Sequence, residues 1–470
     1  MDVRGGLPAI VPARVTSAPA LLIVVAAALL VFDFGARVLT TNDETRFPVM
    51  ARDILAHGHW LRPEINGVPM LNKPPLHAWL IALAAWPGGG VTQRTAAVPS
   101  LLAGLGLVVL TYWIGRWLFD PGAGLAAGAI LVTMAGLFDL ARSPLPDMVL
   151  SFVVTAAVVA FLVAERDGRR GAMLAFYVLT AVAFWVKGPA GLLPLGVALA
   201  YVLVRHGWSG PARLRSLAGL TVLLALVATW WALAFAKGGS VFVEDVVAQD
   251  MGRTYFTSGS WGHGDPLTPI AQALAVLLPW SPALPPAMWW AMRDRDPTRR
   301  AATGFVLVWA GVIFLLVALS HRQRWRYHLP LTVPVAVLLG AWVGSLPWRR
   351  HATLAVSIWT VVALAFVGGQ VMLTSRNSSA TKWQAIAREI DRAPGPVFAI
   401  DAPEIVFEFY LQRPVTVARD FDTFARRPDA RYLLVPQRSL SDVPANVTVQ
   451  AVADGIVAGR RFVLLKRSAR

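Results

Sequence analysis

The sequence predicts an all-α polytopic membrane protein of about 11 transmembrane helices, followed by a small C-terminal α/β domain. Two observations predict this fold class. Of the 470 residues, 56% are hydrophobic and 15% are charged, against about 45–50% and about 25% in an ordinary soluble domain. The chain also holds many apolar runs long enough for a helix that crosses a hydrocarbon core, which takes about 20 residues.

The first of these runs is predicted to stay in the mature protein, because it is long for a signal-peptide core and lacks a convincing cleavage site. The apolar stretch 76–90 is left out of the spans. It has only about 15 residues and suits a re-entrant or interfacial helix better. The predicted spans lie at about 18–40, 95–116, 121–140, 146–164, 171–186, 188–204, 216–236, 267–290, 302–320, 329–346 and 351–373.

Arginine placement predicts the orientation, because cytoplasmic connections are rich in Lys and Arg. With a cytoplasmic N-terminus, the connections that follow even-numbered spans should be basic, and counting 76–90 as a span would invert this bias. The basic residues in those connections are Arg116, Arg166, Arg169, Arg170, Arg205, Arg213, Arg215, Arg293, Arg295, Arg299, Arg300, Arg349 and Arg350.

Two domains are predicted. Residues 1–374 form the transmembrane domain, and 41–93 are its first outer loop. Residues 375–470 alternate helix-like and strand-like segments, which indicates an extracytoplasmic α/β domain. The helix-like segments are 383–390 and 403–411, and the strand-like ones are 397–400, 415–418, 432–435 and 462–465.

The net charge of +16 lies mostly in short connections between apolar runs. This placement favours anionic lipid head groups and a phosphate-bearing substrate as partners, and argues against nucleic acid. The chain has no cysteine, so disulfides and thiol chemistry are excluded.

The first outer loop carries the clearest candidate site. An acidic pair, Asp43 and Glu44, is followed by Arg46 and later by Lys73-Pro74-Pro75. Carboxylates at a membrane edge are costly and often mark function. A preorganised pocket is one interpretation, and a helix-capping acidic pair with a solvated lysine is the other. The spacing alone leaves both open.

These loop residues, with the segments 58–63 and 66–67, resemble the aminoarabinose transferase and protein O-mannosyltransferase superfamily, whose members are inverting glycosyltransferases with the C-type membrane fold. The similarity continues in order over about residues 40–345. It includes Arg94, Gly115-Arg116, Pro146-Asp147-Met148, Lys187-Gly188-Pro189 and Arg326-Tyr327-His328-Leu329-Pro330.

The resemblance implies transfer of a sugar from a polyprenyl-phosphate donor to a lipid, glycan or protein acceptor, on the outer face of a bacterial inner (plasma) membrane. Surface helices are expected in the first outer loop. Asp43 would be the catalytic carboxylate that orients or deprotonates the acceptor hydroxyl. Glu44 would support the substrate site, and Arg46 and Lys73 would bind the donor phosphate.

A second group of candidates lies further along the chain. Asp147 would be the second catalytic carboxylate, although Asp after Pro146 also suits a helix N-cap. The basic run Arg322, Arg324 and Arg326, with Tyr327, lies on the predicted outer side. Arginine suits bidentate phosphate contacts, and anchoring to lipid head groups is the alternative.

Two further residues are candidates for substrate contacts, Trp60 by stacking on a sugar and His263 between two glycines beside Asp265. Relatives can pair an equivalent histidine with an acidic residue before the Lys-Pro-Pro lysine. Here that position is Asn72, a poor ligand, so no metal site is assigned, although a divalent metal stays possible as a cofactor. Phe47 replaces a tyrosine usual in the motif, so the donor sugar is not identified.

Two other function classes predict different features. A secondary transporter or flippase of lipid-linked sugars should show repeated halves and ionisable residues at mid-membrane, whereas the charges here gather at one face. A non-catalytic scaffold would tolerate replacement of Asp43 and Lys73.

Overall fold

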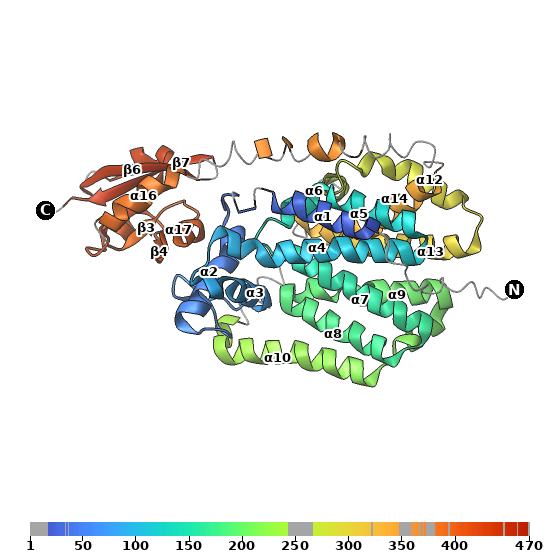
Figure 1. Cartoon of the computed structure of the whole chain (residues 1–470). Coiled ribbons are helices and arrows are strands. Elements are labelled where there is room, and N and C mark those ends of the chain that lie inside the picture. Colours follow the sequence, from blue (N-terminus) through green and yellow to red (C-terminus); the bar gives the residue numbers. More distant parts are fainter. Residues whose placement is uncertain are drawn as a thin grey trace.

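The computed structural model describes residues 17–32, 34–35, 37–242, 267–320, 323–346, 359, 361–365, 368–369, 371–372, 381–392, 395–444, 447–457 and 459–468. Most of these residues lie in a bundle of long helices, and a small α/β unit lies at one end of it (Figure 1). The bundle helices are α1 (Ser17–Val31), α4 (Gln93–Leu118), α5 (Pro121–Val132), α6 (Ala135–Leu140), α7 (Asp147–Asp167), α8 (Arg170–Lys187), α9 (Leu193–His206), α10 (Leu217–Phe242), α11 (Thr268–Val276), α12 (Leu284–Arg293), α13 (Pro297–Ala318) and α14 (Thr332–Ser345).

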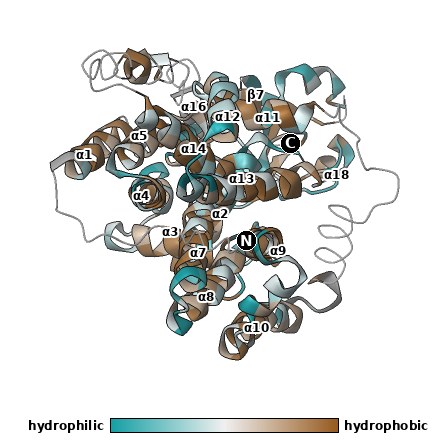
Figure 2. Cartoon of the chain, turned by 90° about the vertical axis from the view of Figure 1, so that its right-hand side faces the viewer, coloured by the Kyte–Doolittle hydropathy of each residue, from teal (hydrophilic) through white to brown (hydrophobic). Residues whose placement is uncertain are grey.

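Short 3₁₀ helices join several of these elements: η2 (Gly188–Leu192), η3 (Gly207–Leu214), η5 (Ser281–Ala283) and η6 (Trp325–Leu331). Hydrophobic residues predominate along the bundle helices (Figure 2). Six helical stretches of the described chain are long and apolar enough to cross a membrane, namely Gln93–Leu118, Asp147–Asp167, Arg170–Leu214, Leu217–Lys237, Pro297–Ala318 and Trp325–Ser345. A helical multi-pass membrane protein is confirmed, and the number of 11 spans stays a prediction.

The helices differ from the predicted spans in two places. The span at 121–140 is divided into α5 and α6, and the span at 267–290 into α11, η5 and α12. Most of the last predicted span lies outside the described residues.

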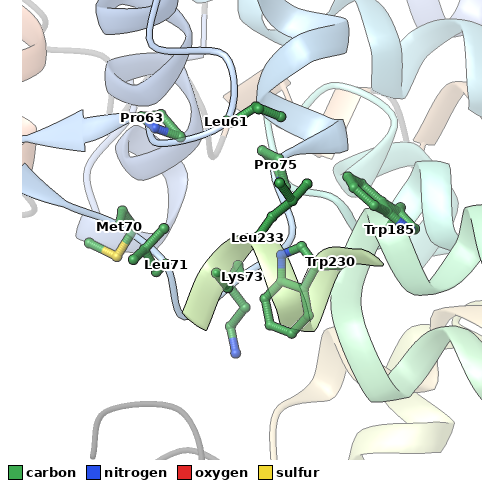
Figure 3. A pocket seen from close by; sticks show the side chains of 10 residues that line it. Leu61, Pro63, Met70, Leu71, Lys73, Pro75, Trp185, Trp230 and Leu233 are labelled. Carbon is green, nitrogen blue, oxygen red and sulfur yellow. The ribbon is translucent and has the colours of Figure 1, made fainter. Parts of the chain in front are cut away.

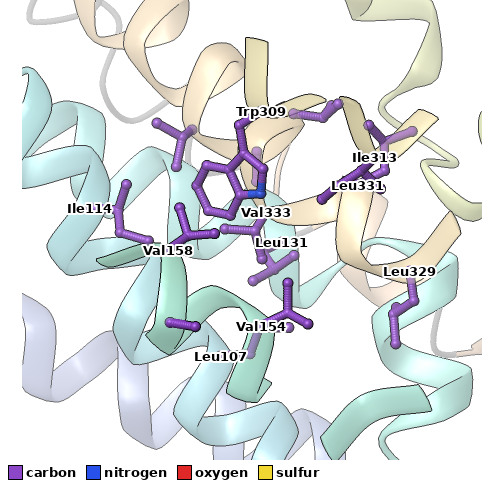
Figure 4. Packing of buried hydrophobic residues seen from close by; sticks show 14 of the residues in the cluster. Leu107, Ile114, Leu131, Val154, Val158, Trp309, Ile313, Leu329, Leu331 and Val333 are labelled. Carbon is purple, nitrogen blue, oxygen red and sulfur yellow. The ribbon is translucent and has the colours of Figure 1, made fainter. Parts of the chain in front are cut away.

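Trp309 of α13 lies in the buried core of the bundle. Figure 4 shows its ring beside Val333 of α14, with Leu131 of α5, Val154 of α7 and Leu107 of α4 further along the same cluster, each fully buried. Between membrane helices such packing rests on van der Waals contact and small residues. At Gly340 of α14 an added Cβ would lie 2.6 Å from a backbone oxygen of α5, so these two helices need glycine to approach.

The first outer loop holds helix α2 (Asn42–His57), the two-stranded hairpin β1 (Glu64–Ile65) and β2 (Val68–Pro69), helix α3 (Leu76–Ala85) and the 3₁₀ turn η1 (Trp86–Gly88). Helix α2 begins with a capping box between Thr41 and Glu44, which satisfies two otherwise unpaired N–H groups. Helix α3 has 10 residues, about 15 Å of helix. It is therefore too short to cross a core of about 30 Å, in agreement with leaving 76–90 out of the spans.

The C-terminal unit contains a five-stranded sheet in the order β4-β3-β5-β7-β6. Strand β3 (Val397–Ala399) pairs in parallel with β4 (Val415–Val417) and β5 (Tyr432–Pro436), whereas β7 (Arg460–Arg467) pairs antiparallel with β5 and β6 (Val449–Val457). Its helices are α16 (Thr381–Arg392), α17 (Glu404–Leu411) and α18 (Phe421–Ala425), with the 3₁₀ turn η8 (Gln437–Asp442).

The four predicted strand-like runs coincide with β3, β4, β5 and β7, and the two helix-like runs with α16 and α17. The prediction lacked β6, whose exposed and half-buried residues give no apolar run. The proposed boundary at residue 375 lies outside the described residues.

Candidate active site

A cavity of about 630 Å³ lies where the first outer loop meets the ends of α7, α8, α9, α10 and α13. Seven of the eleven candidate residues line it: Asp43, Arg46, Lys73, Asp147, Arg324, Arg326 and Tyr327. Apolar side chains line the rest, among them Leu150, Leu192, Leu193, Trp230, Trp231 and Leu316. The cavity thus joins a strongly charged part to an apolar part.

Asp43 lies in the first turn of α2 and faces three arginines. Its Oδ2 accepts a hydrogen bond from Nη2 of Arg326 at 2.9 Å and another from Arg324. Nη2 of Arg46 lies 3.7 Å from Oδ1. Burial acts to raise the pKa of Asp43, but the hydrogen bond and charge of Arg326, with the charges of Arg324 and Arg46, outweigh burial and hold this pKa below its ordinary value. Asp43 is therefore ionised at neutral pH.

Glu44 does not line the cavity. Its Oε1 accepts a hydrogen bond from Nη2 of Arg37 at 2.6 Å, and its Oε2 accepts from the backbone N–H of Thr41 at 3.2 Å. Arg37 also donates to Asp139 of α6. Of the two interpretations of the acidic pair, capping applies to Glu44 and the pocket to Asp43.

Asp147 begins α7 and is 3% exposed at its side chain. The N-cap position is occupied by Pro146, and the carboxylate of Asp147 accepts a hydrogen bond from Nζ of Lys187. Nε of Arg326 lies 3.7 Å from its Oδ2. Arg326 therefore lies between both carboxylates and joins the two halves of the charged cluster.

Lys187 is the last residue of α8, and sequence reasoning noted its motif without placing it in the site. The chain leaves α8 through Gly188 at φ 63°, a conformation that favours glycine. A Cβ at Gly191 would lie 2.1 Å from the backbone nitrogen of Phe184. This tight turn leaves Nζ of Lys187 4.4 Å from the ring centre of Tyr327, a cation–π distance. The sequence feature that could have placed Lys187 in the site is a lysine at the end of an apolar helix, directly before Gly-Pro.

Lys73 lies where the outer loop meets α10. Figure 3 shows its side chain beside Trp230, below Leu71 and Leu233. Lys73 and Trp230 line both this small hollow and the larger cavity. The two prolines that follow Lys73 have fixed φ angles, so the backbone that carries the lysine is restricted.

The other candidates lie elsewhere. Trp60 is half-buried and packs against a hydrophobic cluster formed by residues of α2 and α3, among others. Its backbone oxygen accepts a hydrogen bond from Nε1 of Trp79 at 2.6 Å, and it does not line the cavity. His263 and Arg322 lie outside the described residues. Within the part of the chain that the structure describes, Asp53, His57 and His59 place their ligand atoms within 4.8 Å of one another, outside the cavity. Imidazole and carboxylate groups suit divalent metals.

The chain is similar to known proteins in sequence and in fold. Residues 72–232 match the family model for dolichyl-phosphate-mannose-protein mannosyltransferase. The undecaprenyl phosphate-alpha-4-amino-4-deoxy-L-arabinose arabinosyl transferase of Edwardsiella ictaluri is 26% identical over 336 residues, which cover 68% of this chain and 58% of that protein. The match thus spans little more than half the length of that relative.

Two solved structures have the same fold. ArnT from Cupriavidus metallidurans bound to undecaprenyl phosphate superposes with a TM-score of 0.79 at 18% identity, over 95% of this chain and 97% of that one. The Archaeoglobus fulgidus oligosaccharyltransferase gives 0.58 at 13% identity, over 90% and 70%. The chain therefore has the C-type membrane glycosyltransferase fold. Within that class, the matches confirm its resemblance to the aminoarabinose transferase and protein O-mannosyltransferase superfamily.

Proposed function

We propose that this protein is an inverting glycosyltransferase that moves a sugar from a polyprenyl-phosphate donor to a lipid, glycan or protein acceptor. The observation that carries the proposal is the cavity in which Asp43 faces Arg324 and Arg326 beside an apolar wall. A polyprenyl-phosphate sugar has a matching division into an anionic head and an apolar tail. The relative named for undecaprenyl phosphate and the structure that contains this lipid support the same donor class.

The proposed reaction is a single displacement. An acceptor hydroxyl oxygen attacks the anomeric carbon from the side opposite the carrier phosphate and forms a new C–O bond. The bond to the phosphate oxygen breaks with its electron pair going to the phosphate, and the hydroxyl proton passes to Asp43. Configuration at the anomeric carbon is inverted. For an acceptor that is already an ionised phosphate, Asp43 acts by positioning alone.

The arginines around Asp43 imply an order of donor binding and acceptor activation. While they bind Asp43, its low pKa makes it a poor proton acceptor. A carrier phosphate offers the same guanidinium groups a competing bidentate partner. Donor binding would then draw Arg324 and Arg326 away from Asp43 and raise its pKa. The donor is expected to bind before the acceptor hydroxyl is activated.

Asp147 would act through its neighbours in this scheme. Its carboxylate holds Lys187 and lies against Arg326, so it fixes two cations that face the cavity. Lys187, Lys73 and Arg326 would bind the phosphate and stabilise the charge that develops on it.

We also propose that the cavity opens on the outer face of a bacterial inner membrane, with 11 spans, a cytoplasmic N-terminus and an extracytoplasmic C-terminal domain. Helix α7 begins at the cavity and has 21 residues, about 30 Å of helix. Its far end therefore lies near the opposite membrane face, where Arg166, Arg169 and Arg170 gather. The positive-inside rule assigns that face to the cytoplasm.

The test is transfer by purified protein from a panel of undecaprenyl-phosphate-linked sugars, with envelope lipids and glycans of a deletion strain analysed by mass spectrometry to find the acceptor. Asp43→Asn keeps size and most hydrogen bonding but removes the base, so turnover should fall about 10²–10⁴-fold. Lys73→Ala and Arg326→Ala should each weaken binding of the polyprenyl-phosphate donor by about 1.5–3 kcal/mol, which is the contribution of one hydrogen bond to a charged group.

Asp167→Asn is the matched control, because it makes the same change at the far end of α7. It should keep wild-type turnover. Near-wild-type turnover by Asp43→Asn would overturn the assigned mechanism. Transport of the lipid-linked sugar without transfer would favour a flippase.

A further inference from the structure

The C-terminal unit packs directly against the helix that carries Asp43. Figure 1 shows α17 at the same end of the bundle as α2. Ile405 and Phe409 of α17 are buried in one cluster with Phe47, Met50 and Ile54 of α2. Two segments about 360 residues apart in the chain thus share a core beside the cavity.

Tyr410 of α17 joins two parts of the transmembrane domain. Its hydroxyl oxygen accepts a hydrogen bond from the backbone N–H of Leu39 at 2.8 Å and another from Nε2 of Gln93 at 2.8 Å. Leu39 is buried and lies in the segment that leads into α2, four residues before Asp43. Without the hydroxyl, the N–H of Leu39 would lose its partner, which is costly for a buried group.

Two glutamates of α17 bind two separate parts of the first outer loop. The carboxylate of Glu404 accepts from Nδ2 of Asn42, the residue before Asp43, at 3.2 Å. Oε1 of Glu408 accepts from the backbone N–H of Asn66 at 3.2 Å, and Oδ1 of Asn66 accepts from Val415 at 2.7 Å. These bonds connect the C-terminal unit to the start of α2 and to the turn of the hairpin.

The first turn of α2 is therefore held from two directions. On the bundle side, Arg37 and Asp139 hold Glu44. On the other side, Tyr410 and Glu404 hold the residues that precede Asp43. The arginines that bind Asp43 itself are the groups for which the donor phosphate would compete, so they cannot keep Asp43 in place during the reaction.

We infer that the C-terminal domain is part of the catalytic apparatus, with Tyr410 and Glu404 as positioning residues that fix the carboxylate of Asp43 while the donor occupies the arginines. The inference rests on the proposed function and deepens it. A displacement of about 1 Å at a reacting group can cost about 10²-fold in rate, so a modest loosening of α2 is enough to slow turnover.

Tyr410→Phe removes one oxygen and tests this role. We expect kcat to fall about tenfold while the KM for the undecaprenyl-phosphate sugar stays near wild type, because Lys73 and Arg326 are untouched. The matched control is Tyr177→Phe, which also removes a hydroxyl bond, here to the backbone oxygen of Leu214 at 2.7 Å, outside the cavity. Tyr177→Phe should keep wild-type kcat.

A double-mutant cycle identifies the Glu404 contact. Glu404→Ala and Asn42→Ala should lower kcat by similar factors, and the double variant should be little worse than either, since both remove the same bond. Glu404→Gln keeps an acceptor oxygen and should restore most of the rate.

A readout that needs no transfer separates this inference from the proposed function. In the cysteine-free chain, Asp43→Cys reports the exposure of position 43 through its rate of reaction with a thiol reagent. Adding Tyr410→Phe should change that rate at least twofold, and adding Tyr177→Phe should not. If transfer is absent but labelling responds, the function fails and the positioning role stands.

Two results would overturn the inference. One is an unchanged kcat together with unchanged labelling in Tyr410→Phe. The other is a fall in kcat that is matched by a fall in the thermal unfolding midpoint and is equal in Glu404→Gln and Glu404→Ala, since that pattern reports general destabilisation.

Discussion

Removing the charge of Lys187 alone should destabilise the protein more than removing both charges of the Lys187–Asp147 pair. Asp147 is 3% exposed at its side chain and Lys187 is 17% exposed, so the pair is largely removed from water. Lys187→Met would leave the carboxylate of Asp147 buried, with Nε of Arg326 at 3.7 Å as its nearest remaining cation among the described residues.

The structure sets the size of this effect. Breaking a buried ion pair by removing one partner costs about 3–5 kcal/mol, whereas replacing both partners by uncharged groups is often nearly neutral. Because Arg326 still compensates part of the charge, we expect about 3 kcal/mol for Lys187→Met. Lys187→Met/Asp147→Asn should lie within about 1 kcal/mol of wild type, which gives a coupling energy of about 2 kcal/mol or more.

The assay is unfolding by SDS in mixed micelles, followed through the fluorescence of the 19 tryptophans, for wild type, both single variants and the double variant. Arg438→Met is the control, because its pair with Asp401 is more than half exposed on both sides and such pairs contribute about 1 kcal/mol or less. All three cavity variants should lose transfer, so stability and activity separate in the double variant. Equal stability of Lys187→Met and the double variant would refute the reasoning.

The remaining predictions concern pH and orientation. The pKa of folded Asp43 lies below its ordinary value of 3.8, so the stability its charge contributes is present above that value and is lost as the pH falls through the lower folded pKa. Arg326→Gln removes the largest cause that lowers the pKa of Asp43 and leaves burial, which raises it. The acid limb of kcat/KM should therefore move to higher pH, and an unmoved limb would assign it to another group. Single cysteines at Gly67 and Ser441 should react with an impermeant thiol reagent on intact cells, and labelling of Gly168→Cys or Asp296→Cys would contradict the orientation.

The charged part of the cavity was largely predictable because its residues lie in short motifs beside apolar runs. The sequence could not decide between capping and catalysis for the pair Asp43 and Glu44. In the structure Glu44 belongs to the capping box with Thr41, in line with the Thr41-x-x-Glu44 pattern, and Asp43 lines the cavity. The catalytic role of Asp43 stays a proposal. Successive helix positions point in different directions, and this separates the two carboxylates in space.

The contacts that hold the site could not be predicted. Arg37 and Asp139 are 102 positions apart in the sequence, and Leu39 and Tyr410 are 371 positions apart. No local sequence pattern predicts such pairings. The broken spans have a similar cause. Hydropathy sums apolar residues and ignores where the helix stops, so it merged α5 with α6 and α11 with α12.

The balance of charge in the cavity bears on which reaction it favours. Among the described lining residues, five cations face two carboxylates: Arg46, Lys73, Lys187, Arg324 and Arg326 against Asp43 and Asp147. A sugar phosphodiester carries one negative charge, and the departing polyprenyl phosphate gains a second. A surplus of fixed cations therefore stabilises the transition state and product more than the donor, which is the condition for catalysis. A flippase carries its lipid unchanged, so no second negative charge develops for such a surplus to stabilise. The electrostatics thus favour transfer over transport, independently of any relative.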